Sequence, residues 1–153
     1  MGHRRKLILA LGAGALLAPV GAIAQQKPSS RIWRVGILAS GSPASAGHLY
    51  DAFAKGLHDL GYVEGKNVVF ERRFAEGELS RLPKLAAELV QAKVDVIFAP
   101  NSITVQNAKQ VAGTIPIVFA SVDDPVGSGF VASLARPGGN ITGLATIQNE
   151  LSA

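Results

Sequence analysis

Two apolar runs enclose a helix-like segment in residues 94–120, which read VDVIFAPNSITVQNAKQVAGTIPIVFA. The first run, 94–99, is almost continuously apolar, as is typical of a strand covered on both faces of a sheet. Residues 102–112 place Val105, Ala108 and Ala112 on one helical face. The second run, 115–120, has Pro116 near its start, where a strand tolerates a residue without a backbone N–H. This segment therefore predicts a strand, a helix and a second strand.

The same alternation continues on both sides of this unit. Upstream, we predict strands at 32–39 and 67–74, a helix at 46–60, and a second helix that ends near Val90 and has Ser80 as its N-cap. Downstream, we predict a short helix at 128–134, a turn at 136–140 and a strand at 141–144. The apolar face of the first helix is predicted to consist of Leu49, Phe53, Leu57 and Leu60.

Strands and helices that alternate with short connections indicate right-handed crossovers and a parallel sheet. We therefore predict an α/β fold, a Rossmann-like parallel sheet with helices on both faces, over residues 32–145. Ligands of such sheets bind outside the carboxyl ends of the strands. The loops at 40–47, 100–102 and 121–128 are accordingly the candidate binding loops.

Eight residues in these loops are candidates for ligand binding, because polar groups and helix N-termini at such positions bind small polar solutes. They are Ser40, Ser42, Ser45, Asn101, Ser102, Val122, Asp123 and Asp124. Structural alternatives exist, since serine and asparagine are common N-caps and an aspartate before Pro125 is typical of a turn. The adjacent acids could accept a ligand ammonium or hold Mg²⁺. Because neighbouring side chains diverge in extended chain, we expect only one acid to face a ligand.

Combinations of residues that support catalysis are missing from the sequence. His48 and His58 are the only histidines after His3, and the chain has no cysteine for a nucleophile, a disulfide or a thiolate metal site. It also lacks the G-x-S-x-G, H-E-x-x-H, G-x-G-x-x-G and phosphate-loop motifs. We therefore expect a binding protein with no cofactor or metal, rather than an enzyme.

The charge of the chain gives no support to nucleic-acid binding. The net charge is +4, and Arg4, Arg5 and Lys6 supply three of these charges, so the remainder carries 4 − 3 = +1. A nearly neutral domain lacks the positive patch that phosphate backbones require.

The basic residues at positions 4–6 precede an apolar stretch at 7–20 and the small residues Ala22 and Ala24. This pattern predicts a signal peptide over residues 1–24, cleaved after Ala24, and a periplasmic or secreted product without stable membrane insertion. An uncleaved membrane anchor and export by the twin-arginine route are the alternatives. Residues 25–31 are predicted to be a linker.

Four further motifs carry a family resemblance. They are Gly61-Tyr62-Val63-Glu64-Gly65, Leu82-Pro83-x-Leu85-Ala86-Ala87-Glu88, Asp124-Pro125-Val126-Gly127 and Arg136-Pro137-Gly138-Gly139-Asn140. In this order and spacing they resemble the ABC transporter substrate-binding proteins, whose better-known members include tryptophan- and tyrosine-binding importer components. The resemblance runs from Arg34 to the C-terminus. It implies the periplasmic-binding-protein type I fold, with 32–145 as the N-terminal lobe and ligand contacts from the three candidate loops.

The resemblance further implies the extracytoplasmic solute-binding component of an ABC importer. Its partners would be a small organic solute, for which an aromatic amino acid is the candidate, and a membrane permease. Residues 146–153 would begin the crossover to a second lobe that is missing, so we expect the chain to bind weakly alone. The alternatives are an extracytoplasmic sensor domain of a signalling system and a small Mg-dependent α/β enzyme or receiver that uses Asp123 or Asp124.

Overall fold

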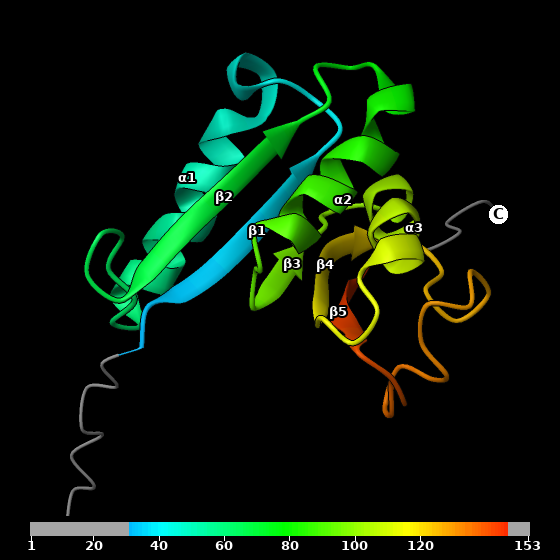
Figure 1. Cartoon of the computed structure of the whole chain (residues 1–153). Helices are drawn as coiled ribbons and strands as arrows, with labels where there is room; N and C mark the ends of the chain where they lie inside the picture. The colour runs from blue at the N-terminus through cyan, green and yellow to red at the C-terminus, as the bar shows by residue number, and fades with distance from the viewer. Residues whose placement is uncertain (1–30, 147–153) are drawn as a thin grey trace, which may run out of the picture.

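The computed structural model describes residues 31–146, so the predicted signal peptide and the predicted crossover lie outside the described residues, apart from Thr146. The described part is one α/β unit with a parallel sheet in the order β2-β1-β3-β4-β5 (Figure 1). The strands are β1 (Trp33–Ala39), β2 (Val68–Phe74), β3 (Val96–Phe98), β4 (Ile117–Val122) and β5 (Ile141–Ala145). The helices are α1 (Pro43–Asp59), the 3-10 turn η1 (Leu79–Arg81), α2 (Leu82–Gln91) and α3 (Ser102–Val111). The predicted fold class is confirmed.

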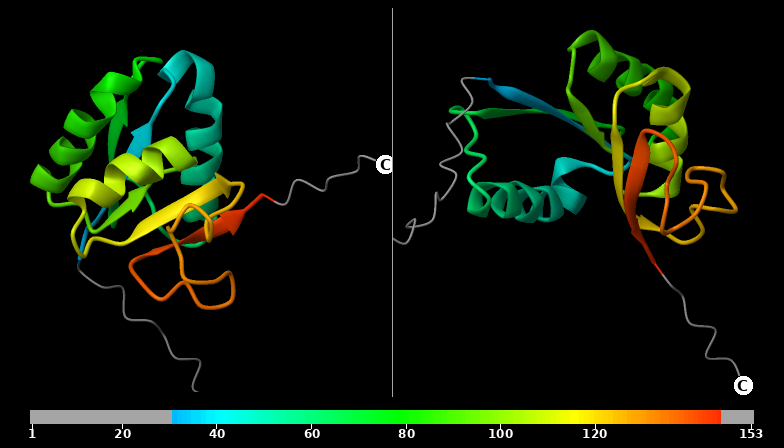
Figure 2. Two further views of the ribbon diagram at one scale, coloured as in Figure 1. Left: turned by 90° about the vertical axis from the view of Figure 1, so that its right-hand side faces the viewer. Right: turned by 90° about the horizontal axis from the view of Figure 1, so that it is seen from below.

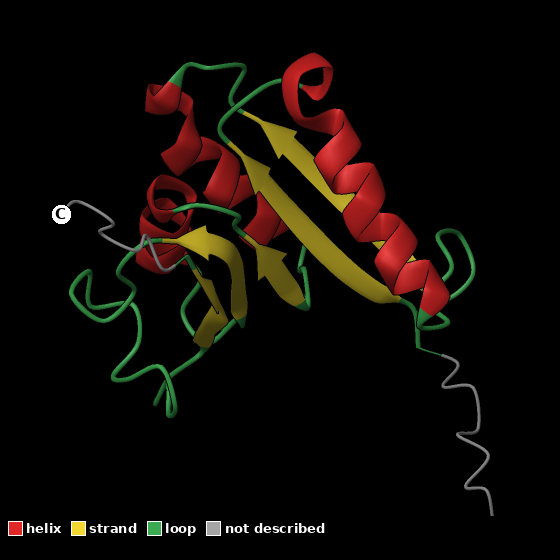
Figure 3. Ribbon diagram, turned by 180° about the vertical axis from the view of Figure 1, so that it is seen from behind, coloured by secondary structure: helices red, strands yellow, loops and turns green. Residues whose placement is uncertain are grey.

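Helices lie on both faces of the sheet, with α1 on one face and α2 and α3 on the other (Figures 2 and 3). Alternate residues of β1 point to opposite faces, so Ile37 packs under α1 while Leu38 packs in the cluster under α2 and α3. Both side chains are fully buried. Gly36 allows α2 to approach closely, because a Cβ at this position would lie 3.2 Å from Leu89 Cδ2 and 3.2 Å from Val94 Cγ1.

Aromatic side chains fix α1 on the sheet. Phe53 stacks on Phe98 of β3 with a centroid separation of 4.3 Å, and Tyr50 meets Phe74 of β2 edge-on at 5.5 Å. This packing turns the helix so that Leu49 and Leu60 are 61% and 75% exposed. The prediction that these two leucines belong to the buried face was therefore wrong.

The helix starts also differ from their predicted positions. Helix α1 begins at Pro43, three residues before the predicted start at Ala46, because Ser42 is its N-cap and the first turn accommodates a proline. Ser80 does not cap α2; it lies in η1, and its hydroxyl donates to Glu78 Oε1 at 3.0 Å.

The predicted helix at 128–134 does not form. The amides of Phe130 and Val131 both donate to the Pro125 carbonyl, at 2.9 and 3.2 Å, and Gly129 has a φ of +67°. A positive φ interrupts the right-handed helical path, so the chain follows a series of turns instead. The glycine-rich sequence around this segment favours turns over a continuous helix.

Part of the sheet has one face uncovered by the described residues. On β4 and β5 the side chains that point away from α2 and α3 include Ala120, Thr142 and Leu144, and Leu144 is 72% exposed. Helix α1 lies over the β1 and β2 half of the sheet and does not extend over β4 and β5 (Figure 2). Within residues 31–146, no helix is long and apolar enough to cross a membrane.

Candidate functional site

The loop after β1 turns directly into α1 and uses its serines as a helix cap. Ser42 Oγ accepts a hydrogen bond from Ser45 N at 3.2 Å, and Ser45 Oγ accepts one from Ser42 N at 3.0 Å. This reciprocal arrangement is a capping box, here with serine at both positions. Both hydroxyls therefore cap the N-terminus of α1. Ser45 is exposed, and Ser42 is half-buried at the carboxyl end of β1.

The loop after β3 contains a second capping box. Asn101 Oδ1 accepts from Thr104 N at 3.2 Å, and Thr104 Oγ1 accepts from Asn101 N at 3.2 Å. Thr104 is fully buried. The Asn101 amide also donates from Nδ2 to Ser40 Oγ at 3.3 Å, which joins this loop to the loop after β1. Ser102, the first residue of α3, is exposed.

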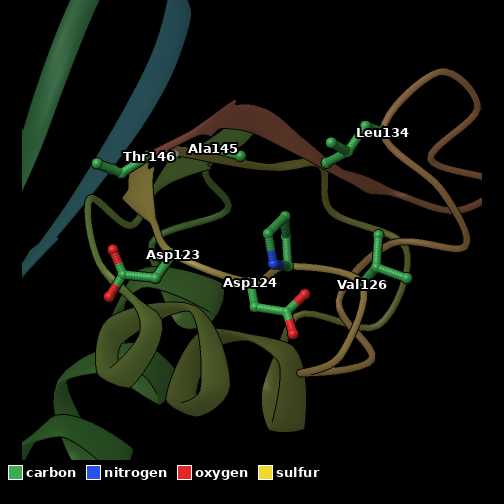
Figure 4. Close-up of a pocket in the computed structure, with 7 residues that line it drawn as sticks. Asp123, Asp124, Val126, Leu134, Ala145 and Thr146 are labelled. Carbon is green, nitrogen blue, oxygen red and sulfur yellow. The ribbon is translucent and has the colours of Figure 1, made fainter. Parts of the chain in front are cut away.

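The two adjacent aspartates after β4 have different surroundings. Asp124 Oδ1 accepts a hydrogen bond from Gly127 N at 2.7 Å, so this carboxylate closes a turn. Asp123 is exposed, and no hydrogen bond or ion pair joins its carboxylate to another of the described residues. The two carboxylates point in opposite directions (Figure 4). The divergence that the sequence predicted is therefore present, and of the two acids Asp123 is the one without a hydrogen-bond partner among the described residues.

Val122 presents no side chain to this edge. Its side chain is fully buried in the core under α3, and its carbonyl accepts from Thr146 N at 2.9 Å. The adjacent Ser121 hydroxyl lies 3.0 Å from Thr146 Oγ1. The ends of β4 and β5 are thus joined through Thr146, which was absent from the predicted residues. Its position just after β5 was the available signal, because strand ends line the ligand edge of a parallel sheet.

A cavity of about 290 Å³ opens at the carboxyl ends of β4 and β5 (Figure 4). Its lining residues are Asp123, Asp124, Pro125, Val126, Leu134, Ala145 and Thr146. The lining combines one carboxylate without a partner among the described residues, a hydroxyl and an apolar wall. Such a cavity can accept a cationic group beside an apolar group, although its volume is at the lower end of the range for small-molecule sites.

Ser102 belongs to a different cavity, of about 490 Å³, on the outer side of α3, where it lies with Lys109 and Phe130. Apart from Ser102 and the buried Val122, the predicted residues fall into three groups. These are Ser42 and Ser45 at the start of α1, Ser40 with Asn101 between the first two loops, and Asp123 with Asp124 at the cavity. Within residues 31–146, no group of three or more histidine or acidic side chains is placed to hold a metal ion.

Comparison with known proteins gives a consistent set of relatives. Residues 34–152 match the family model described as ABC transporter substrate binding protein. A tyrosine-binding protein of Clostridioides difficile is 36% identical over 91 residues, which are 60% of this chain and 26% of that protein. The chain therefore spans about a quarter of the length of this curated relative.

Three solved structures share the fold. An ABC domain in complex with L-Trp from Streptococcus pneumoniae has a TM-score of 0.68 and 26% identity, over 74% of this chain and 38% of that one. A ligand-free, open substrate-binding protein with adhesive properties from Clostridium difficile has a TM-score of 0.67 and 28% identity, over 73% and 38%. A conserved domain protein from Vibrio cholerae has a TM-score of 0.71 and 31% identity, over 78% and 40%.

Proposed function

Because the chain belongs to the ABC transporter substrate-binding protein family, we propose that it is the solute-binding component of an importer and that its solute is an aromatic amino acid. The family match over residues 34–152 carries this proposal. The choice of solute is supported by two relatives, the tyrosine-binding protein of Clostridioides difficile and the L-Trp complex from Streptococcus pneumoniae.

The chemistry at the carboxyl edge of the sheet fits a zwitterionic amino acid. In this proposal the Asp123 carboxylate accepts the ligand ammonium, and Val126 and Leu134, which line the same cavity, contact the aromatic ring. The helix starts at Ser42 and Asn101 provide positive dipole ends, which favour the ligand carboxylate.

We propose that the described unit is one half of a two-lobed clamp. Two observations support this proposal. The cavity is open at the edge of the sheet. The region that matches this chain is 38–40% of each solved relative, so these relatives extend well beyond it. A second lobe would close over the ligand by a hinge motion. The proposed importer role includes export through the signal peptide at 1–24, a periplasmic or secreted location and a membrane permease as partner.

Isothermal titration of the exported protein, whose predicted start is Gln25, tests the choice of solute. If each lobe supplies about half of a binding free energy of about −8 kcal/mol, one lobe retains about −4 kcal/mol, which corresponds to a millimolar Kd. We expect L-tryptophan and L-tyrosine to bind in this range and glycine to bind more weakly.

The Asp123→Asn variant should lose most of this binding, because it removes the charge that we assign to the ligand ammonium. Asp51→Asn, which changes an exposed acid on α1, is the matched control and should bind as the parent does. Equal affinity for glycine and the aromatic amino acids would refute the choice of solute. Micromolar binding by this chain alone would refute the two-lobe account.

A further inference from the structure

Asn101 is the point at which three segments of the binding edge meet. Its Nδ2 donates to Ser40 Oγ at 3.3 Å in the loop after β1, and its Oδ1 caps α3 through Thr104 N at 3.2 Å. Its backbone forms an isolated bridge with Ser121 at the end of β4. The amide of Ser121 also donates to the Pro100 carbonyl at 2.8 Å. A single side chain thus connects the loops after β1 and β3 beside the end of β4.

The loop after β1 has different supports on its two sides. Toward the segment that follows β2, backbone hydrogen bonds hold it, with Glu76 N donating to the Gly41 carbonyl at 3.1 Å and Gly77 N to the Ser40 carbonyl at 2.9 Å. Toward β3, the Asn101–Ser40 hydrogen bond is the side-chain link between the two loops in the described residues. Loss of this bond would leave the loop without a side-chain hydrogen bond to the loop after β3.

Asparagine provides two functions at this position that shorter or charged caps cannot combine. Serine and aspartate are good N-caps, so either can replace the Oδ1 bond to α3. Aspartate has no N–H group, and serine is too short to span both partners. The Asn101 side chain therefore has a role beyond capping α3, because its Nδ2 donates to Ser40 Oγ in the loop after β1.

We propose that Asn101 is a positioning residue that acts through Ser40: it holds the loop after β1, and with it the start of α1, at a fixed place beside the ends of β3 and β4. This replaces the direct ligand contact expected from the sequence with an indirect role. Its effect on ligand affinity rests on the proposed function, whereas its effect on the loop does not.

Amide hydrogen exchange of the exported protein tests the structural part of this proposal. In Asn101→Ser, which keeps a capping oxygen, the amides of Ser42, Glu76 and Gly77 should exchange about three to ten times faster, since one net hydrogen bond contributes about this factor. Ser40→Ala should produce the same acceleration without altering the cap. Ser40→Thr keeps the hydroxyl that accepts from Asn101, so its amides should exchange at the same rates as those of the parent protein. Asn107→Ala is the matched control, because its amide bonds only to the Ile103 carbonyl within α3.

The double variant Asn101→Ser/Ser40→Ala separates an indirect role from independent effects. If Asn101 acts through Ser40, the double variant exchanges no faster than either single variant, and its affinity for L-tryptophan falls by the same factor as that of each single variant. Exchange at Ser42, Glu76 and Gly77 that is unchanged in both single variants, or that increases additively in the double variant, would overturn the proposal. Failure of the parent protein to bind L-tryptophan would overturn the proposed function and leave the exchange result to decide this inference.

Discussion

The adjacent acids Asp123 and Asp124 should have separable effects on binding and stability. The Asp124 carboxylate accepts the Gly127 amide at 2.7 Å and closes the turn that forms one wall of the cavity. Asp124→Ala removes this bond from an exposed turn, which should lower the free energy of unfolding by about 1 kcal/mol. Asp123 makes no such bond to the described residues, so Asp123→Ala should change the free energy of unfolding by less than about 0.5 kcal/mol. It should nevertheless abolish most of the ligand binding.

A third variant tests whether the turn bond is the cause. A Cβ at Gly127 would overlap the Asp124 carboxylate, so Gly127→Ala should displace that carboxylate and also cost about 1 kcal/mol. Because both variants remove the same bond, Asp124→Ala/Gly127→Ala should cost about 1 rather than about 2 kcal/mol, a coupling of about 1 kcal/mol.

Urea unfolding followed by circular dichroism measures these free energies, and titration with L-tryptophan measures binding in the same preparations. Additive costs for Asp124→Ala and Gly127→Ala would refute the turn assignment. A loss of stability in Asp123→Ala as large as that in Asp124→Ala would refute the assignment of turn closure to Asp124 alone.

The remaining predictions concern packing and pH. Gly36→Ala should destabilise the protein by about 1 kcal/mol in urea unfolding, because the new Cβ lies 3.2 Å from Leu89 Cδ2; Gly56→Ala, where a Cβ meets nothing, should be neutral or stabilising. The hydrogen bond from the Arg34 amide lowers the pKa of Asp95 in the folded protein. Asp95 therefore stabilises the fold at pH values above its unfolded pKa of about 4. This stabilisation is lost as the pH falls through the lower pKa of the folded state. Asp95→Asn should therefore flatten the decline of the free energy of unfolding below about pH 4, and an unchanged decline would contradict this assignment.

The strands and the sheet were predictable because local pattern and topology agree in this chain. Each apolar run of the parallel sheet is followed by a helix or a turn, and the chain order alone implies right-handed crossovers. The prediction failed where tertiary packing or backbone conformation overrides the pattern. Tyr50 and Phe53 determine the buried face of α1 and leave Leu49 exposed, and Gly129 adopts a positive φ where a helix was expected.

The candidate site was less predictable because caps and ligand contacts require the same residue types. Ser42 and Asn101 are both helix caps in the structure, which a sequence pattern cannot distinguish from a ligand contact. The different surroundings of Asp123 and Asp124 depend on the turn at Gly127, and the link from Ser40 to Asn101 joins residues 61 positions apart. Such long-range contacts are defined only by the folded chain.

The central claim is that the carboxyl edge of this sheet binds an aromatic amino acid, and a titration that resolves individual amides tests it most directly. We predict that L-tryptophan added to the exported protein produces saturable NMR shifts at the amides of 40–45, 101–102, 121–127 and 146, with a millimolar Kd, and that Asp123→Asn removes them. Saturable shifts confined to other parts of the chain, or no saturable shift at tens of millimolar ligand, would contradict the account.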